Sequence, residues 1–389
     1  MQGVAHWKTL PAGQQPDWPD QATLAHARAV LADAPALVRA ADVAELKALL
    51  AAAARGEAQV VQSGDCAEDP AECTPGYVAR KAALLDVLAG AMKARSMKPV
   101  IRVGRLAGQF GKPRSKPTET VDGVELPVYR GHMVNSPEPD PRLRRPDPER
   151  LIAGYRAAAQ AMRALGWHGE RRRSTAEAPV WTSHEALLLD YEEPLLRTGP
   201  DGSVLLTSTH WPWIGERTRD PGGAHVALLA QVTNPVAVKV GPTTTPDGLL
   251  ELCARLDPDR EPGRLTLIAR MGHGTVADRL PGLVLAARAA GHPVLWLCDP
   301  MHGNTVSTPD GVKTRYVESI VQEVEEFQTA VTEYGGVAAG LHLETTPDRV
   351  RECVADASRV GELGEKYATF CDPRLNPGQA FDVVSAWRG

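Results

Sequence analysis

The hydrophobic positions of the chain fall into short runs that alternate with longer amphipathic stretches. Between most of these runs the apolar residues recur every three or four positions, as in residues 76–95, 246–255, 276–290 and 313–333. Such alternation is typical of consecutive βα units and a parallel sheet. The eight strand-length runs are residues 58–65, 99–105, 179–185, 204–213, 234–242, 264–272, 292–300 and 337–345.

Eight consecutive units predict a closed α/β barrel of the (β/α)8, or TIM, type, with an open doubly wound sheet as the alternative. The Ala- and Leu-rich stretch 21–56 predicts helices ahead of the first strand. We therefore divide the chain into a short N-terminal helical extension, residues 1–56, and a barrel domain, residues 57–389. The polar, Pro- and Arg-rich stretch 136–178, with a helix near 147–165, is interpreted as an insertion between the second and third strands.

Composition narrows the class of protein. The chain of 389 residues carries a net charge of −5, which argues against nucleic acid or an anionic membrane as a partner. Its apolar runs fall short of the about 18 residues that a spanning helix needs, and its N-terminus has no secretory pattern. Six cysteines in so long a chain are not a disulfide framework, so we expect a cytoplasmic protein with reduced thiols.

Cationic side chains gather where the predicted strands end. Arg105, Lys239 and Arg270 end strands two, five and six, and Arg217 follows strand four. In a barrel these ends converge on one mouth. A buried cation is costly unless an anion meets it, although a single strand-end Arg or Lys is as often a salt-bridge partner on the rim. Taken together, the cations predict a site for a small molecule with several negative charges, most simply phosphates.

The same ends carry residues that could bind a metal. One thiol, one imidazole and two carboxylates come from separate loops, a mixed set that suits a borderline divalent ion such as Mn, Fe, Co or Zn. The tripeptide Cys-Asp-Pro occurs twice, and on strand alternation its cysteines, Cys298 and Cys371, are expected to point away from the site. The candidate ligands are Cys66, His302, Glu344 and Asp372.

At these residues the sequence resembles the type II 3-deoxy-D-arabino-heptulosonate 7-phosphate (DAHP) synthases. The blocks that match lie between residues 62 and 376 and include "QSGDCAE", "RVGRLAGQFGKPRS", "LPVYRGHMVNS", "HWPWIGERTR", "NPVAVKVGP", "DPMHGNT", "GLHLETT" and "CDPRLN". The resemblance implies a (β/α)8 barrel that uses a divalent metal to condense phosphoenolpyruvate with D-erythrose 4-phosphate, the first step of the shikimate pathway.

Motif by motif, the resemblance also implies roles. Cys66, His302, Glu344 and Asp372 correspond to the metal ligands, for which Mn²⁺ or Co²⁺ is expected first and Zn²⁺ or Fe²⁺ next. Lys112 is expected to be a proton donor, Glu216 to orient a water, and His302 to belong to the catalytic set. The remaining correspondences are phosphoenolpyruvate binding by Arg105, Glu216 through its backbone, Arg217, Lys239 and Arg270, and an aldose-phosphate clamp of Arg114 and Ser115 beside Lys112.

The chain is shorter than the long members of that family, which carry inserts that bind aromatic amino acids as feedback inhibitors. It is most similar to a short subgroup of secondary metabolism, notably phenazine biosynthesis, and the apolar N-terminal helices lead us to expect a homo-oligomer. Two alternatives stay open on the sequence alone. One is an amino-DAHP synthase that uses an imino-tetrose phosphate, and the other is a catalytically silent barrel that binds metal or sugar phosphate.

Overall fold

The computed structural model describes residues 6–121, 123–168, 177–364 and 366–389. Its central sheet is a closed barrel of parallel strands in the order β1-β14-β11-β10-β9-β8-β5-β2. The last strand pairs with the first, with Val60 opposite Gly340 and Gly64 opposite Glu344, so the predicted barrel is confirmed over the open sheet. The barrel strands are β1 (Gln59–Gly64), β2 (Val100–Arg105), β5 (Val180–Glu185), β8 (Trp211–Ile214), β9 (Val236–Val240), β10 (Leu265–Ala269), β11 (Leu295–Cys298) and β14 (Ala338–Glu344).

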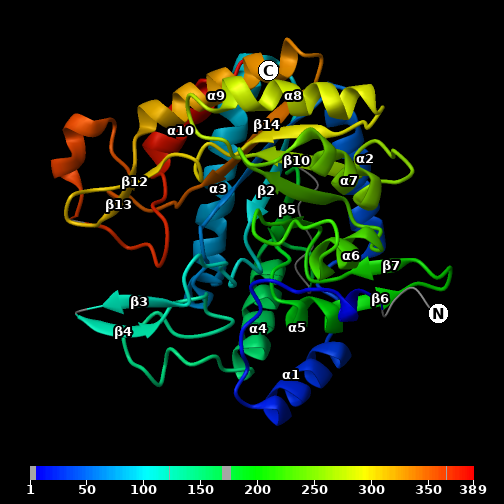
Figure 1. Ribbon diagram of the computed structural model, residues 1–389, viewed down its shortest axis with the longest axis vertical. Coiled ribbons are helices and arrows are strands. Elements are labelled where there is room, and N and C mark those ends of the chain that lie inside the picture. The colour runs from blue at the N-terminus through cyan, green and yellow to red at the C-terminus, as the bar shows by residue number, and fades with distance from the viewer. Residues whose placement is uncertain (1–5, 122, 169–176, 365) are drawn as a thin grey trace.

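Helices surround this sheet (Figure 1). The longest, α3, begins at a Thr74 side chain that accepts from the Tyr77 N–H and ends at Met97, whose φ of 59° is left-handed. No helix in the described residues is long and apolar enough to cross a membrane. The outer helices are α3 (Pro75–Ser96), α4 (Glu149–Ala164), α5 (Leu189–Glu192), α6 (Ala224–Ala230), α7 (Pro246–Leu256), α8 (Val276–Ala289), α9 (Val317–Thr332) and α10 (Pro377–Ser385).

The predicted fourth strand, residues 204–213, is wrong in extent. Its first part, β7 (Val204–Leu206), pairs antiparallel with β6 (Leu196–Thr198) outside the barrel, and β8 begins only at Trp211. The polar residues between them bond to other partners, since Thr207 Oγ1 donates to the Leu195 carbonyl and Ser208 Oγ to Glu192. Side-chain hydrogen bonds of this kind compete with a continuous ladder.

The N-terminal helices α1 (Gln21–Asp33) and α2 (Ala40–Ala54) pack directly on the rest of the chain. α1 lies against α4, and Leu46 and Leu50 of α2 share a core with Val60 and Leu297 of the barrel. The division of the chain into a separate N-terminal extension, residues 1–56, and a barrel domain therefore stays a proposal.

Two hairpins extend the loops after β2 and β11, and Figure 1 shows both projecting from the same side of the molecule. The predicted helix 313–333 begins later than expected, because its first residues form a strand of the second hairpin. The predicted insertion 136–178 holds α4, and its residues 169–176 lie outside the described part. The hairpin strands are β3 (Thr118–Val121), β4 (Val124–Pro127), β12 (Thr305–Ser307) and β13 (Lys313–Arg315), and the short 3-10 helices are η1 (His6–Thr9), η2 (Pro70–Glu72), η3 (Glu193–Leu195) and η4 (Ala357–Glu362).

Candidate active site

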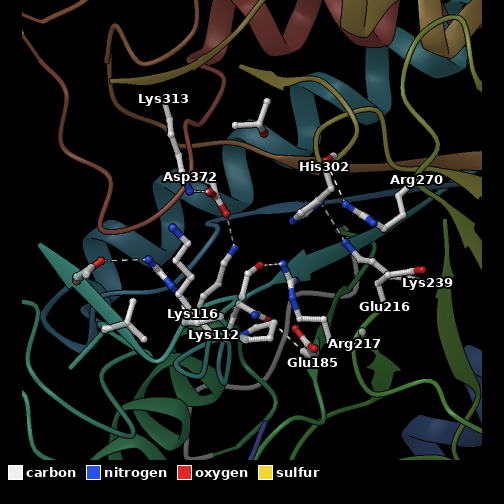
Figure 2. Close-up of a pocket in the computed structure, with 18 of the residues that line it drawn as sticks. Lys112, Lys116, Glu185, Glu216, Arg217, Lys239, Arg270, His302, Lys313 and Asp372 are labelled. Carbon is white, nitrogen blue, oxygen red and sulfur yellow. Dashed lines mark hydrogen bonds and ion pairs between the residues drawn. The ribbon is translucent and has the colours of Figure 1, made fainter. Parts of the chain in front are cut away.

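A cavity of about 670 Å³ opens at the carboxyl ends of the barrel strands, where the sequence placed the reactive side chains. Figure 2 shows cationic groups from several of these ends directed into it. Both hairpins contribute to its rim, through Glu119 of β3 and Lys313 of β13. Ten of the predicted site residues line it: Arg105, Lys112, Arg114, Ser115, Glu216, Arg217, Lys239, Arg270, His302 and Asp372.

The deepest cations lie over one aromatic ring. The Arg105 guanidinium is 5.1 Å from the centre of the Trp213 ring and the Lys239 ammonium is 6.0 Å from it. Arg105 also donates to Glu344 at 3.1 Å, and Lys239 donates to Asp299 at 2.5 Å. Burial lowers the pKa of Lys239 against the attraction of Asp299. An anionic ligand would stabilise both charged forms here.

Outer cations meet from different loops. Arg217, in the loop after β8, donates to Ser115 Oγ at 2.6 Å, so this loop contacts the loop after β2. Arg270 Nη2 donates to the His302 carbonyl at 3.1 Å. Sequence reasoning missed two further lysines of the cavity. Lys116 lies just after the "KPRS" block, which could have indicated it, whereas Lys313 sits on a hairpin that carried no signal.

Three of the four predicted metal ligands meet at one point of the mouth, and the fourth, His302, lies beside one of them. Ligand atoms of Cys66, Glu344 and Asp372 all lie within 4.8 Å of one another, and His302 Nε2 is 3.2 Å from Glu344 Oε1. Lys112 lies among them, with its Nζ 2.6 Å from Cys66 Sγ and 2.8 Å from Asp372 Oδ2. This cluster of potential anions thus already surrounds one cation.

The donor set fits a borderline divalent ion. Burial alone would raise the carboxyl pKa values, but Lys112 holds the pKa of Asp372 well below its usual range, and His302 and Arg315 do the same for Glu344. Both carboxylates are therefore ready to bind a cation. Burial raises the pKa of the Cys66 thiol well above its usual range. Its thiolate needs a strong local positive charge, which a bound divalent ion would supply.

Asp299 orients the imidazole of His302. Its Oδ2 lies 2.7 Å from His302 Nδ1, which leaves Nε2 to face Glu344. A carboxylate behind a ligating histidine is a recurring arrangement in metal sites. Asp299 is the aspartate of the first Cys-Asp-Pro tripeptide, but its supporting position came only from the structure.

Glu68, within the "QSGDCAE" block, supports the loop that carries Lys112. Its buried carboxylate accepts from the backbone N–H groups of Ala107, Gly108 and Gln109 at 3.1, 2.9 and 2.8 Å. Ala107 has a left-handed φ of 64°, so three hydrogen bonds hold a turn that a non-glycine residue resists. No sequence signal distinguished this glutamate from the others.

The expectation for Cys371 was wrong, and that for Cys298 was right. Cys298 is buried in the core outside the barrel. Cys371 instead faces the site, where Arg114 Nη1 lies 3.6 Å from its Sγ. The alternation argument failed because Cys371 lies in a loop after η4 and not on a strand.

These features define a barrel whose mouth combines anion-binding cations with a cluster suited to a divalent metal. The chain matches the model of the Class-II DAHP synthetase family over residues 2–167 and 156–386. It is 56% identical over 376 residues to a "Probable phospho-2-dehydro-3-deoxyheptonate aldolase" of Pseudomonas fluorescens, covering 96% of this chain and 94% of the relative. It therefore belongs to the Class-II DAHP synthetase family.

More distant similarities agree with this assignment. A "Phospho-2-dehydro-3-deoxyheptonate aldolase" of Streptomyces coelicolor is 40% identical over 429 aligned positions, covering 97% of this chain and 95% of the relative. That span exceeds the 389 residues of the chain, so the relative carries residues that this chain lacks. The solved aldolase of the same name from Francisella tularensis has a TM-score of 0.55 at 12% identity, covers 93% of this chain and 97% of its own, and supports the fold alone.

Proposed function

We propose that this chain condenses phosphoenolpyruvate with D-erythrose 4-phosphate and water to give DAHP and inorganic phosphate, the first step of the shikimate pathway. The observation that carries the proposal is the meeting of Cys66, Glu344 and Asp372, the last of which lines the same cavity as the strand-end cations. Membership of the Class-II DAHP synthetase family supports the same reaction.

The cations divide between the two phosphorylated substrates. Arg105, Lys239 and Arg270, with Arg217 and the Glu216 backbone, bind phosphoenolpyruvate, and Arg114 and Ser115 clamp the tetrose phosphate. Guanidinium groups suit this task because they form paired, charge-assisted hydrogen bonds with carboxylate and phosphate. Fixing two anions side by side removes the entropy cost of their encounter, which can be worth an effective molarity of about 10⁵ M or more.

Four side chains would hold the divalent ion: Cys66, His302, Glu344 and Asp372. When bound, the ion supplies Lewis-acid polarisation of the tetrose aldehyde. Manganese or cobalt is proposed first and zinc or iron next, because one thiolate and one imidazole accompany two hard carboxylates.

Side chains close to these four ligands donate a proton and orient water during the reaction. C3 of phosphoenolpyruvate attacks the aldehyde carbon, and Lys112 Nζ gives a proton to the oxygen that becomes an alkoxide. Water adds at C2, where positive charge develops, and the hemiketal phosphate then releases phosphate by C–O cleavage. Glu216 orients that water. Its Oε2 is buried and accepts no hydrogen bond from the described residues, so it is available for this task.

The test is an assay of the metal-stripped chain with both substrates, followed by addition of Mn²⁺, Co²⁺ or Zn²⁺. Heptulosonate and phosphate should appear together, in equal amounts, and only after metal is added. Phosphate release without heptulosonate would contradict the proposal. An imino-tetrose phosphate as the better substrate would redirect it to the amino-DAHP reaction.

The proposal extends to the pathway, the compartment and the oligomeric state of the enzyme. The Streptomyces relative has residues that this chain lacks, which supports a short enzyme. We propose that this short enzyme is free of aromatic feedback and serves secondary metabolism such as phenazine biosynthesis. The cysteines are free in the structure, which fits a reducing cytoplasm. A homo-oligomer stays a prediction. The apolar N-terminal helices suggested it, and the structure buries Leu46 and Leu50 of these helices within the chain.

A further inference from the structure

The segment ahead of α1, residues 10–18, packs along the mouth of the barrel, and we call it the N-terminal strap (blue in Figure 1). The carbonyl of Pro11 accepts from the Ala224 N–H at the start of α6, at 2.9 Å. The Gln15 side chain donates to the Leu187 carbonyl after β5, at 2.8 Å. The strap is therefore anchored to loops that follow two barrel strands.

Gln14 lies between these anchors and touches the loop after β2. Its Oε1 accepts from the backbone N–H of Arg114 at 2.8 Å, and its own carbonyl accepts from the Arg130 guanidinium. Its φ of 62° is left-handed, a conformation that is costly for a residue with a side chain. The contacts with the two arginines hold it there.

The electrostatics of this contact favour a neutral residue. Burial lowers the pKa of Arg130, and the nearby Arg114 guanidinium lowers it further, so the two cations repel each other. The Arg114 guanidinium already pairs with Glu119 at 3.2 Å. Gln14 supplies two neutral acceptors, one for the Arg114 backbone N–H and one for the Arg130 guanidinium, so the strap adds no second carboxylate that would compete with a phosphate.

We infer that Gln14 is a positioning residue for the tetrose-phosphate clamp. It fixes the backbone of Arg114, and with it the neighbouring Ser115, whose Oγ accepts from Arg217 at 2.6 Å. The N-terminal strap, which precedes the barrel in sequence, is thus part of one substrate subsite. The inference rests on the proposed function, because that proposal assigns the clamp to D-erythrose 4-phosphate.

The test compares two adjacent glutamines of the full chain. Gln14→Met keeps the length and the Cβ of the side chain but removes the acceptor for Arg114. Gln15→Met is the matched control, because Gln15 bonds to Leu187 and Leu189 and not to the clamp. Loss of one such hydrogen bond should raise the KM for D-erythrose 4-phosphate about fivefold in Gln14→Met. The KM for phosphoenolpyruvate should stay within twofold, and Gln15→Met should leave both values near those of the wild type.

The outcomes separate the two proposals. An active wild type with an unchanged tetrose-phosphate KM in Gln14→Met overturns the inference and leaves the reaction standing. Equal rises of both KM values, in both variants, also overturn it, because they would show only that the strap stabilises the fold. A wild type that forms no heptulosonate with any added metal overturns the proposed function and the inference together.

Discussion

Arg374 Nη1 donates to Asp65 Oδ1 at 2.7 Å, in a buried ion pair between residues far apart in the chain. Asp65 directly precedes Cys66, and Arg374 lies two residues after Asp372. The pair therefore ties together the backbones that carry two of the proposed metal ligands. The network extends on both sides of the pair. Lys81 Nζ lies 2.6 Å from Asp65 Oδ2, and Glu352 lies 2.8 Å from Arg374 Nη2.

We expect Arg374→Lys to weaken metal binding, because a lysine cannot reach Asp65 and Glu352 at once. Loss of an outer partner of this kind typically costs about tenfold or more in metal affinity. Titration of the metal-free chain with Co²⁺, followed by its absorption bands, would measure this without reference to turnover. Arg388→Lys is the control, since Arg388 pairs with Glu325 on the surface. This variant should bind Co²⁺ with the affinity of the wild type. Equal affinities in all three proteins would contradict the expectation.

Replacement of Lys112 should separate catalysis from binding. Lys112→Met removes the proposed proton donor and should lower kcat by about 10²-fold or more. Because the proposal assigns phosphoenolpyruvate to Arg105, Lys239 and Arg270, the affinity for phosphoenolpyruvate should change little. Steady-state rates and calorimetric titration with phosphoenolpyruvate would measure the two effects. A turnover within twofold of the wild type would exclude the role of Lys112.

The stability of the protein should depend on pH through Glu323 of α9. Burial raises its pKa to about 8, against hydrogen bonds from the Gly272 and Met271 N–H groups. The folded pKa exceeds the unfolded one, so the native state holds the extra proton. Its contribution to stability is therefore greatest at low pH and is lost as pH rises towards 8, by up to about 1.4 kcal/mol per pH unit.

Glu323→Gln should remove this dependence, since the amide does not titrate. Urea unfolding of both proteins between pH 5.5 and 8.5, with metal chelated throughout, would give the difference in free energy of unfolding at each pH. That difference should move in favour of the variant as pH rises. A constant difference would show that Glu323 is ionised in the folded protein over the whole range.

Aromatic amino acids should not inhibit the enzyme. The chain is shorter than its aligned span with the Streptomyces relative. Its resemblance to the short members of the family predicts that it lacks the inserts that bind aromatic amino acids. Steady-state rates with phenylalanine, tyrosine and tryptophan at millimolar concentration, alone and in mixtures, should match the rate without them. Strong inhibition by any of them would reveal a regulatory site within this short chain.

The barrel and the gathering of cationic side chains at its mouth were predictable from the sequence for a physical reason. Parallel strands buried on both faces require long apolar runs, and their carboxyl ends are where a barrel exposes polar groups. The position of Arg105, Lys239 and Glu344 at those ends therefore carried most of the prediction. The fourth strand was misjudged because Val204–Leu206 has the same apolar pattern whether it pairs inside or outside the barrel.

What the sequence by itself determined was the architecture and the kinds of side chain at the mouth, because periodicity and residue type are local properties. Only the tertiary structure decided which distant groups touch: Asp65 with Arg374, Glu68 with the turn at Ala107, and Gln14 with Arg114. Such contacts depend on how loops close over one another in space, and neither spacing nor composition records that geometry.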